Sequence, residues 1–174
     1  QKRISLPTID QKEIPVIKYR ELHIPSARYS KEFCDWHKLH HYSVRDSIYG
    51  SFVHTFNRLI SPDKYFKEHP DYFSEVNGIR VPDKQLCLNN PDVYDEIIKN
   101  LKIKMAKRPD AKVWDVSQND CFGNCTCENC SEVDSLHGGP SGSLIELLNK
   151  IAREFPNKTI STLAYQYTRK APTG

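Results

Sequence analysis

The feature that most constrains the fold is a cysteine-rich segment that follows a strand-like run of residues. Four of the six cysteines lie between Cys121 and Cys130, in the pattern C-x3-C-x-C-x2-C. The run Lys112–Ser117 precedes them and leads into the pair Asn119-Asp120. Strand ends carry the chemistry of barrel and doubly wound α/β enzymes. The segment therefore has to be a metal-binding, a disulfide-bonded or a reactive loop.

Length and composition are those of one globular domain. The chain has 174 residues, 38% of them hydrophobic and 27% charged, which suffices for a hydrophobic core. The net charge of +3 comes without a basic stripe, so nucleic acid is not an expected partner. No run of 18 apolar residues exists, so no membrane span is expected. The chain opens on Gln1 without an apolar signal region, so we expect any secretion signal to be absent or removed.

The hydrophobic pattern alternates between strand-like and helix-like segments. We predict five strands, at Ile14–Ile24, Gly50–Phe56, Gln85–Leu88, Lys112–Ser117 and Ile160–Tyr167. Strands that alternate with helices indicate an α/β fold with a mainly parallel sheet. No glycine-rich phosphate loop follows any of them, so a nucleotide-binding fold has no support.

Three helices are predicted between the strands. The first is capped by Ser30 and runs to His40, and the second is capped by Asn90 with Pro91 at its first position. The third begins with a capping box formed by Ser143 and Glu146. The long aromatic stretch between them, residues 61–82, has a turn at its Asn-Gly pair, residues 77 and 78, and is expected to be a functional loop.

The number of strands predicts a partial barrel. A complete (β/α)8 barrel takes about 250 residues and eight strands. Five strands and a C-terminus directly after the fifth predict one (β/α) domain over residues 1–174, truncated at its C-terminal end. A small open sheet of five strands is the alternative.

Asp120 is the leading catalytic candidate. A partly buried carboxyl group can act as a general acid or base because burial raises its pKa. Asn119 and Gln118 would position hydroxyl or amide groups of a substrate, although Asn-Asp pairs also form plain polar turns at strand ends. Further polar residues near predicted strand ends would line the same pocket in a barrel: Arg20, Glu21, His54, Tyr165 and Gln166.

The cysteines predict a structural zinc site. Zinc favours four tetrahedral thiolate or imidazole ligands, and the close spacing of Cys127 and Cys130 suits it. Cys125 lies nearby, and Cys87 would end a neighbouring parallel strand on the same face. Cys121 and His137 are alternative fourth ligands. One or two disulfides are the competing interpretation.

Several sequence blocks resemble a known bacterial family. The blocks occur in this order: Phe52-Val53-His54-Thr55-Phe56, Tyr65-Phe66-x2-His69-Pro70-x-Tyr72-Phe73, Gln85-Leu86-Cys87-Leu88-x-Asn90-Pro91, Val116-Ser117-Gln118-Asn119-Asp120, Cys125-x-Cys127-x2-Cys130, Ser141-Gly142 and Thr162-Leu163-Ala164-Tyr165-Gln166-Tyr167-Thr168-Arg169. Together they resemble an uncharacterised family of glycoside-hydrolase-like barrel domains. Its members often follow an α-glucuronidase-like N-terminal domain in secreted or periplasmic polysaccharide-degrading systems.

The resemblance implies a TIM-barrel fold, an oligo- or polysaccharide ligand, and a periplasmic or extracellular location. Related hexosaminidase-type barrels carry two acidic residues where this chain has Asn119 and Asp120, so only Asp120 remains as an acid. A second carboxylate, which most glycosidases need, would come from Glu21 or from a strand beyond residue 174. The expected function is therefore a glycoside hydrolase that requires no cofactor. A non-catalytic carbohydrate-binding domain and a thiolate–metal interaction module are the two alternatives.

Overall fold

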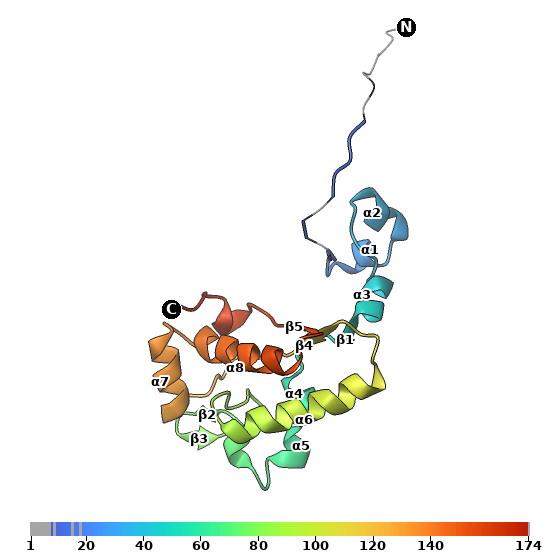
Figure 1. Cartoon of the computed structure of the whole chain (residues 1–174). Coiled ribbons are helices and arrows are strands. Elements are labelled where there is room, and N and C mark those ends of the chain that lie inside the picture. Colours follow the sequence, from blue (N-terminus) through green and yellow to red (C-terminus); the bar gives the residue numbers. More distant parts are fainter. Residues whose placement is uncertain (1–7, 9, 15, 18, 174) are drawn as a thin grey trace. The chain divides into compact units, whose positions relative to one another are not determined.

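The chain forms two compact units, Gln1–Arg45 and Asp46–Gly174 (Figure 1). The structure is a computed structural model that describes residues 8, 10–14, 16–17 and 19–173. The boundary between the units falls within helix α3 (Tyr42–Ile48).

The first unit contains short helices in place of a strand. Helices α1 (Pro25–Arg28) and α2 (Lys31–Trp36) precede α3. Ser30 caps α2 as predicted, since its hydroxyl accepts a hydrogen bond from Phe33 N at 3.2 Å. The helix ends at Trp36 rather than His40, and Lys38 follows with a φ of 55°.

The predicted first strand, Ile14–Ile24, is wrong. Its described residues form no strand, and two of its residues, Pro15 and Lys18, lie outside the described part of the chain. A strand is stable only with a neighbour to pair with, and residues 19–45 of this unit form helices and connections instead. The apolar pattern of the segment did not reveal that no partner strand follows it nearby.

The second unit holds the parallel sheet and the longer helices. Its elements in chain order are β1 (Tyr49–Ser51), α4 (Phe56–Leu59), α5 (Pro62–Tyr65), the 3-10 helix η1 (Pro70–Tyr72), β2 (Glu75–Val76), β3 (Ile79–Arg80), α6 (Pro91–Lys107), β4 (Val113–Asp115), α7 (Glu128–Leu136), α8 (Ser141–Glu154), β5 (Thr159–Ser161) and the 3-10 helix η2 (Gln166–Thr168).

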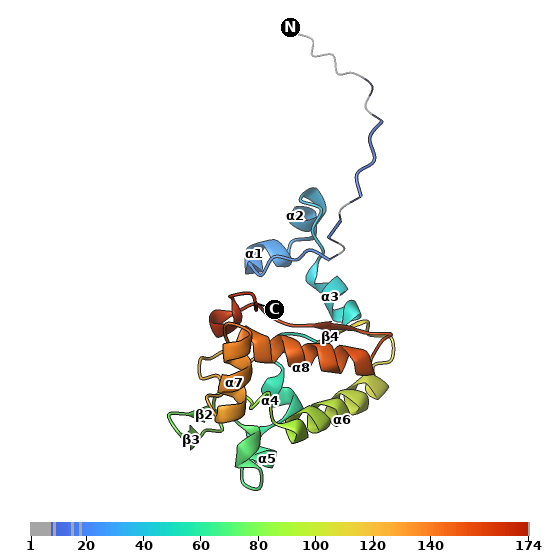
Figure 2. The same cartoon turned by 60° about the vertical axis from the view of Figure 1, so that its left-hand side comes forward.

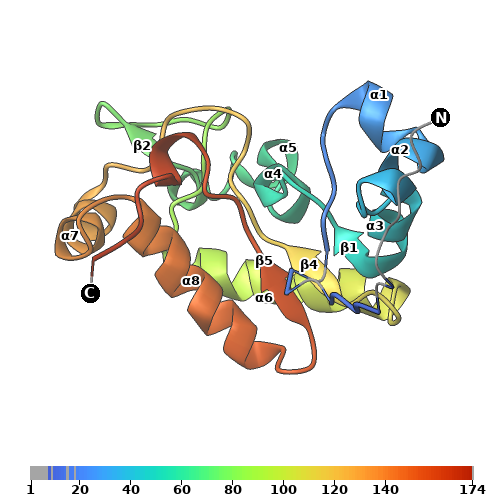
Figure 3. The same ribbon diagram turned by 90° about the horizontal axis from the view of Figure 1, so that it is seen from above.

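The sheet has three parallel strands in the order β1-β4-β5. Helix α8 connects β4 to β5, which is the crossover that parallel neighbours require. Figure 3 shows α6 passing behind β4 and β5 and α8 running alongside β5, and in Figure 1 both long helices lie below the strands. The α/β class with a parallel sheet is confirmed, but the described residues form three parallel strands rather than five.

The predicted third strand, Gln85–Leu88, is not part of this sheet. Ser74 N donates to Gln85 O and Cys87 N donates to Tyr72 O, both at 2.9 Å, and Leu86 forms an isolated antiparallel bridge with Phe73. The segment therefore pairs with the aromatic stretch before it. The predicted turn at Asn77-Gly78 is confirmed, because both residues have positive φ and join β2 to β3 in a hairpin.

The helix starts were predicted with mixed success. Asn90 caps α6, with its side-chain oxygen accepting from Asp92 N at 2.9 Å, as expected. The capping box of Ser143 and Glu146 is wrong because α8 already begins at Ser141. The Ser143 hydroxyl instead donates to Asp134 and accepts from Asn89.

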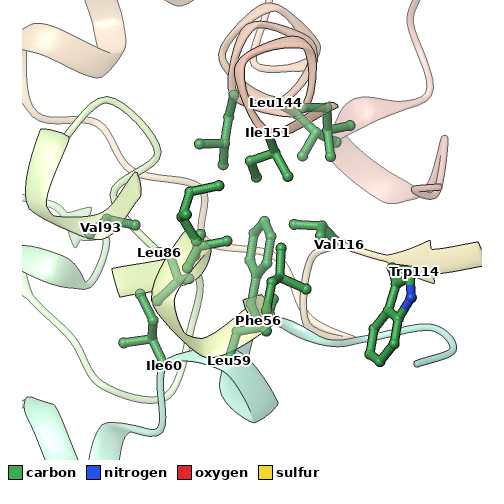
Figure 4. Close-up of a cluster of buried hydrophobic side chains, with 14 of the residues drawn as sticks. Phe56, Leu59, Ile60, Leu86, Val93, Trp114, Val116, Leu144 and Ile151 are labelled. Carbon is green, nitrogen blue, oxygen red and sulfur yellow. The ribbon is translucent and has the colours of Figure 1, made fainter. Parts of the chain in front are cut away.

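The core lies between the sheet and the two long helices. Figure 4 shows Leu144 and Ile151 of α8 facing Phe56 and Val116, with Trp114 at the edge of the cluster. The buried apolar side chains of α6 and α8 follow the helical repeat and form one stripe along each helix. Full burial of each large apolar side chain contributes about 1.5–3 kcal/mol, so this seam fixes both helices against β4.

Gly50 allows β1 to approach the ring of Trp114, and a substitution tests this contact. A Cβ atom at residue 50 would lie 2.3 Å from Trp114 Cζ2. Gly50→Ala should therefore lower the free energy of unfolding by about 1–3 kcal/mol, measured by urea denaturation. In a Trp114→Leu background the same substitution should have a clearly smaller effect. Equal effects in both backgrounds would contradict the contact.

Candidate functional site

The carboxyl end of β4 continues into three buried polar residues, Ser117, Gln118 and Asn119. The Gln118 amide nitrogen donates to Tyr165 O at 2.6 Å and to the Thr168 hydroxyl at 2.9 Å. These bonds tie the end of β4 to η2. Gln118 was predicted to position a substrate, but in the structure its amide is directed to the chain's own backbone.

Asn119 is also saturated by internal hydrogen bonds. Its amide nitrogen donates to Asn57 Oδ1 at 2.9 Å and to Lys84 O at 2.6 Å, and its oxygen accepts from Asn57 N at 3.1 Å. Gln85, which the sequence analysis did not select, completes the network by bonding Asn119 N and the carbonyl oxygens of Asn119 and Cys121. The amide group of Asn119 is therefore occupied by internal hydrogen bonds, which leaves it no free donor for the predicted catalytic role.

Asp120 is exposed and is linked to two other predicted residues. It contacts Tyr165 directly, and Tyr165 in turn contacts His54. The Tyr165 hydroxyl donates to Asp120 Oδ1 at 2.9 Å, and the Tyr165 ring lies edge-on to His54 with centroids 5.8 Å apart. His54 Nδ1 lies 2.9 Å from Gln118 O. A carbonyl oxygen only accepts, so Nδ1 carries a proton and Nε2 is left for a ligand. We call Asp120, Tyr165 and His54 the strand-end cluster.

The backbone around the strand-end cluster is strained. Val53 and His54 have φ values of 40° and 52°, and Gln166 has 50°, in the left-handed region that β-branched and other side chains rarely adopt. Arg58 stabilises this turn by donating to the carbonyl oxygens of Phe52, Val53 and His54. The predicted strand Gly50–Phe56 is therefore shorter than expected and ends at Ser51. Such outliers concentrate at binding and catalytic sites.

The remaining predicted pocket residues have other surroundings. Glu21 belongs to the first unit, where its nearly buried carboxylate pairs with Arg28 at 3.2 Å and Arg45 at 3.3 Å. The Arg20 guanidinium, in the same unit, donates to Ile17 O and Lys38 O. Both residues therefore hold their own unit together. Gln166 lies next to the strand-end cluster in sequence, and its side-chain oxygen is buried without a partner.

Asp115 is a buried carboxylate that the sequence analysis missed. It is the last residue of β4, and its oxygens accept hydrogen bonds from the Ser117 and Ser161 hydroxyls. Burial raises the pKa of Asp115, and the two serines oppose that shift. An acidic residue inside an otherwise apolar run was the available signal. Because both hydroxyl groups that bond to it belong to β5 and to the end of β4, we assign Asp115 a structural role.

Four cysteine sulfur atoms form a second candidate site. The Sγ atoms of Cys87, Cys125, Cys127 and Cys130 all lie within 4.8 Å of one another. Cys87 Sγ is 3.6 Å from Cys127 Sγ and 3.7 Å from Cys130 Sγ. Thiolates around a tetrahedral zinc lie about 2.3 Å from the metal and therefore roughly 3.8 Å from one another. The spacing fits a four-thiolate metal site, which we call the thiolate cluster.

Three separate segments supply the thiolate cluster. Cys87 comes from the segment before α6, Cys125 and Cys127 from the loop after β4, and Cys130 from the first turn of α7. The β2–β3 hairpin lies beside this loop in Figures 1 and 2, and Thr126 N donates to Glu75 O at 2.8 Å. Cys87 was expected to end a parallel strand. It reaches the cluster because its segment pairs with the aromatic stretch instead.

The surroundings of the thiolate cluster favour negatively charged sulfur. Glu75 N lies 3.3 Å from Cys125 Sγ, and Arg80 Nη1 lies 3.5 Å from it. Hydrogen bonds from the neighbouring thiols of Cys130 and Cys87 lower the pKa of Cys125, and the contact with Cys125 raises the pKa of Cys130 to about 12. Among the packed sulfur atoms, ionisation is thus favoured at Cys125 and opposed at Cys130. A cation among them allows all four to be thiolates.

The alternative ligands lie outside this cluster. Cys121 Sγ accepts from the Gln85 amide at 3.4 Å. His137 Nε2 lies 2.8 Å from Glu146 Oε1, which lowers the pKa of that carboxyl group. All six cysteines are free thiols in the structure, including buried Cys34 of the first unit.

Comparison with known families gives one match. The family model described as Domain of unknown function (DUF4838) matches residues 1–174. The chain belongs to this family. No curated protein and no solved structure matches it. This membership agrees with a resemblance to a family without an assigned activity, and the carbohydrate-related expectation stays a prediction. Among the described residues no helix has the length and apolar character to cross a bilayer.

The internal role of Asn119 predicts the effect of an isosteric acid. Asn119→Asp replaces the donor to Lys84 O with an oxygen, so the free energy of unfolding should fall by roughly 2–4 kcal/mol at neutral pH. Burial beside a carbonyl raises the pKa of the new carboxyl group in the folded state. The loss should therefore grow as the pH rises above about 4 and shrink below it.

Urea denaturation at several pH values measures the effect of Asn119→Asp. The matched control is Asn149→Asp, which makes the same change at an exposed position on α8. A stable Asn119→Asp variant would contradict the internal role of this amide.

Proposed function

We propose that the chain is an α/β domain stabilised by zinc, in which the thiolate cluster binds one structural Zn²⁺. The observation that carries this proposal is the convergence of four sulfur atoms from three segments to within 4.8 Å of one another. Soft thiolates in a tetrahedral set favour zinc among common divalent ions. Four protein ligands leave no open coordination position, so the role we propose is structural rather than catalytic.

The proposed metal would hold the loop that carries Asp120. Residues 125–130 follow Asp120 closely, and Cys87 links them to the segment that Gln85 also anchors. Backbone and arginine donors to Cys125 are the outer contacts that commonly support zinc thiolates. The positive charge of Arg80 would offset part of the excess negative charge of a zinc ion with four thiolates.

Metal analysis tests the zinc proposal. Protein purified without chelators should contain one zinc per chain, and Co²⁺ substitution should give the visible absorption of a tetrahedral thiolate site. Cys87→Ser should lower the zinc content well below one per chain. Removing the metal should lower the midpoint of thermal unfolding by roughly 10 °C or more.

Cys121→Ser is the matched control, because Cys121 lies next to the cluster in sequence but outside it in space. This variant should keep one zinc per chain. Zinc loss in Cys121→Ser with retention in Cys87→Ser would contradict the ligand assignment. Disulfide bonds among these cysteines, or bound iron in place of zinc, would contradict the assignment of zinc.

A second proposal concerns the strand-end cluster, which we propose binds a saccharide. Asp120 is exposed, and only one of its oxygens is recorded accepting from Tyr165, so the carboxylate can also accept from sugar hydroxyls. The Tyr165 ring and His54 Nε2 add an aromatic surface and a polar atom. The contacts of Tyr165 with Asp120 and with His54 favour this role. Binding without turnover is the form we favour, because most glycosidases need a second carboxylate.

Binding and turnover assays separate these alternatives. Asp120→Asn should weaken binding in a glycan-array screen and in titrations with the selected glycan by about tenfold, as expected for loss of one charged hydrogen-bond acceptor. Asp110→Asn, an exposed change of the same charge, should bind like the wild type. Cleavage of the glycan that Asp120→Asn leaves unchanged would overturn the assignment of Asp120.

We also propose, from the family resemblance, that the sheet belongs to a larger (β/α) barrel and that the protein acts outside the cytoplasm. The parallel order β1-β4-β5 and the crossover through α8 support a barrel segment.

A further inference from the structure

A basic groove lies between α4 and the C-terminal half of α6. Two adjoining pockets of about 230 and 240 Å³ share the side chains of Arg58, Leu59, Lys104 and Lys107. Neither pocket is lined by an aspartate or a glutamate. The groove thus concentrates positive charge in a chain whose overall balance is nearly neutral, and its cationic side chains are Arg58, Lys64, Lys104, Lys107 and Arg108.

Internal ion pairs do not account for this charge. Arg58 donates to backbone carbonyl oxygens, and in the described part of the chain no salt bridge joins Arg58, Lys104 or Lys107 to a carboxylate. The carboxylate whose titration Arg58 influences is Asp115, and hydroxyl groups of two serines already bond to it. The C-terminal dipole of α6 explains a preference for Lys104 and Lys107. It does not explain Arg58, which lies on another helix.

An unpaired donor lies at the same place. Trp114 lines the 230 Å³ pocket and is 1% exposed, yet its Nε1 has no hydrogen-bond partner. In Figure 4 this nitrogen lies on the side of the ring away from the labelled aliphatic side chains. An indole N–H can only donate, and buried donors in folded proteins nearly always have an acceptor. The unpaired indole nitrogen and the cationic side chains without a carboxylate partner thus belong to residues that line one pocket.

Further polar groups line the same pocket. The hydroxyl groups of Ser51 and Thr55 lie in its wall, and the backbone of Gly50 packs closely against the indole ring. The Thr55 hydroxyl already donates to Asp115 O. The volume is smaller than a typical drug-sized site. It suits a small ligand rather than a polymer.

We propose that this groove binds the oxyanion of a small ligand, a phosphate or sulfate group. Trp114 Nε1 donates to one oxygen, and Arg58, Lys104 and Lys107 supply the positive charge. Oxyanions with several charged oxygens suit a site that has several separate donors. The proposal is independent of the thiolate cluster and of the strand-end cluster, which involve other residues.

Nuclear magnetic resonance of the tryptophan indole N–H groups tests the proposal directly. The chain has two tryptophans, and Trp36 of the first unit is exposed, so Trp36→Phe leaves the Trp114 signal alone and assigns it. Inorganic phosphate, inorganic sulfate and acetate are titrated at constant ionic strength, with sodium chloride as the balancing salt. The Trp114 indole N–H should shift in a saturable way with phosphate or sulfate, and more weakly with acetate.

Lysine variants locate the binding site. Lys104→Ala and Lys107→Ala should each weaken phosphate or sulfate binding by about fivefold. Lys102→Ala removes the same charge from an exposed position of the same helix that lies outside both pockets, and it should leave the affinity unchanged. Comparable thermal unfolding of the three variants shows that the fold is kept.

Three outcomes would overturn the proposal. A shift that is linear in anion concentration or equal for chloride would indicate a general salt effect. Equal losses in Lys102→Ala and Lys104→Ala would place the effect in the overall charge of α6. Saturable anion binding that leaves the Trp114 signal in place would put the anion elsewhere.

Discussion

Three buried amide side chains around the end of β4 determine where the surrounding loops lie. Gln118 and Asn119 follow β4 and bond to the backbone of residues 57, 84 and 165, and Gln85 bonds back to the backbone of residues 119 and 121. Each lost partner of a buried polar group destabilises the fold by about 1–3 kcal/mol. A displaced loop would break several such bonds at once. The amides therefore hold the strand-end region in a single arrangement.

Within three residues, the chain changes from side chains that bond inside the protein to one that is exposed to solvent. Gln118 and Asn119 are directed inward and are saturated, whereas Asp120 is exposed and contacts Tyr165. An acid at residue 119 could not donate to Lys84 O, so an amide is the side chain that fits there. The hydrogen bonds of Asn119 therefore account for the amide at this position, whereas exposed Asp120 remains the acid for which we propose a role in binding.

The sequence predicted local features well and long-range partners poorly. The caps at Ser30 and Asn90, the Asn77-Gly78 turn and the α/β class all follow from local patterns. The apolar runs Ile14–Ile24 and Gln85–Leu88 suggested strands of the main sheet, but pairing depends on segments distant in sequence. The same limit hid the amide network, because nothing local shows that Gln85 would meet Asn119.

The loop after β4 is fastened at both ends by different chemistry. Gln85 bonds the carbonyl oxygens of Asn119 and Cys121, and the thiolate cluster gathers residues 125–130. Between these points, no hydrogen bond is recorded within the described chain for residues 122–124, and Phe122 is two-thirds exposed, at 67%. Freedom to adapt is thus confined to a short span beside Asp120. The zinc ion that we propose would hold residues 125–130 and would leave this short span, with its exposed Phe122, unconstrained.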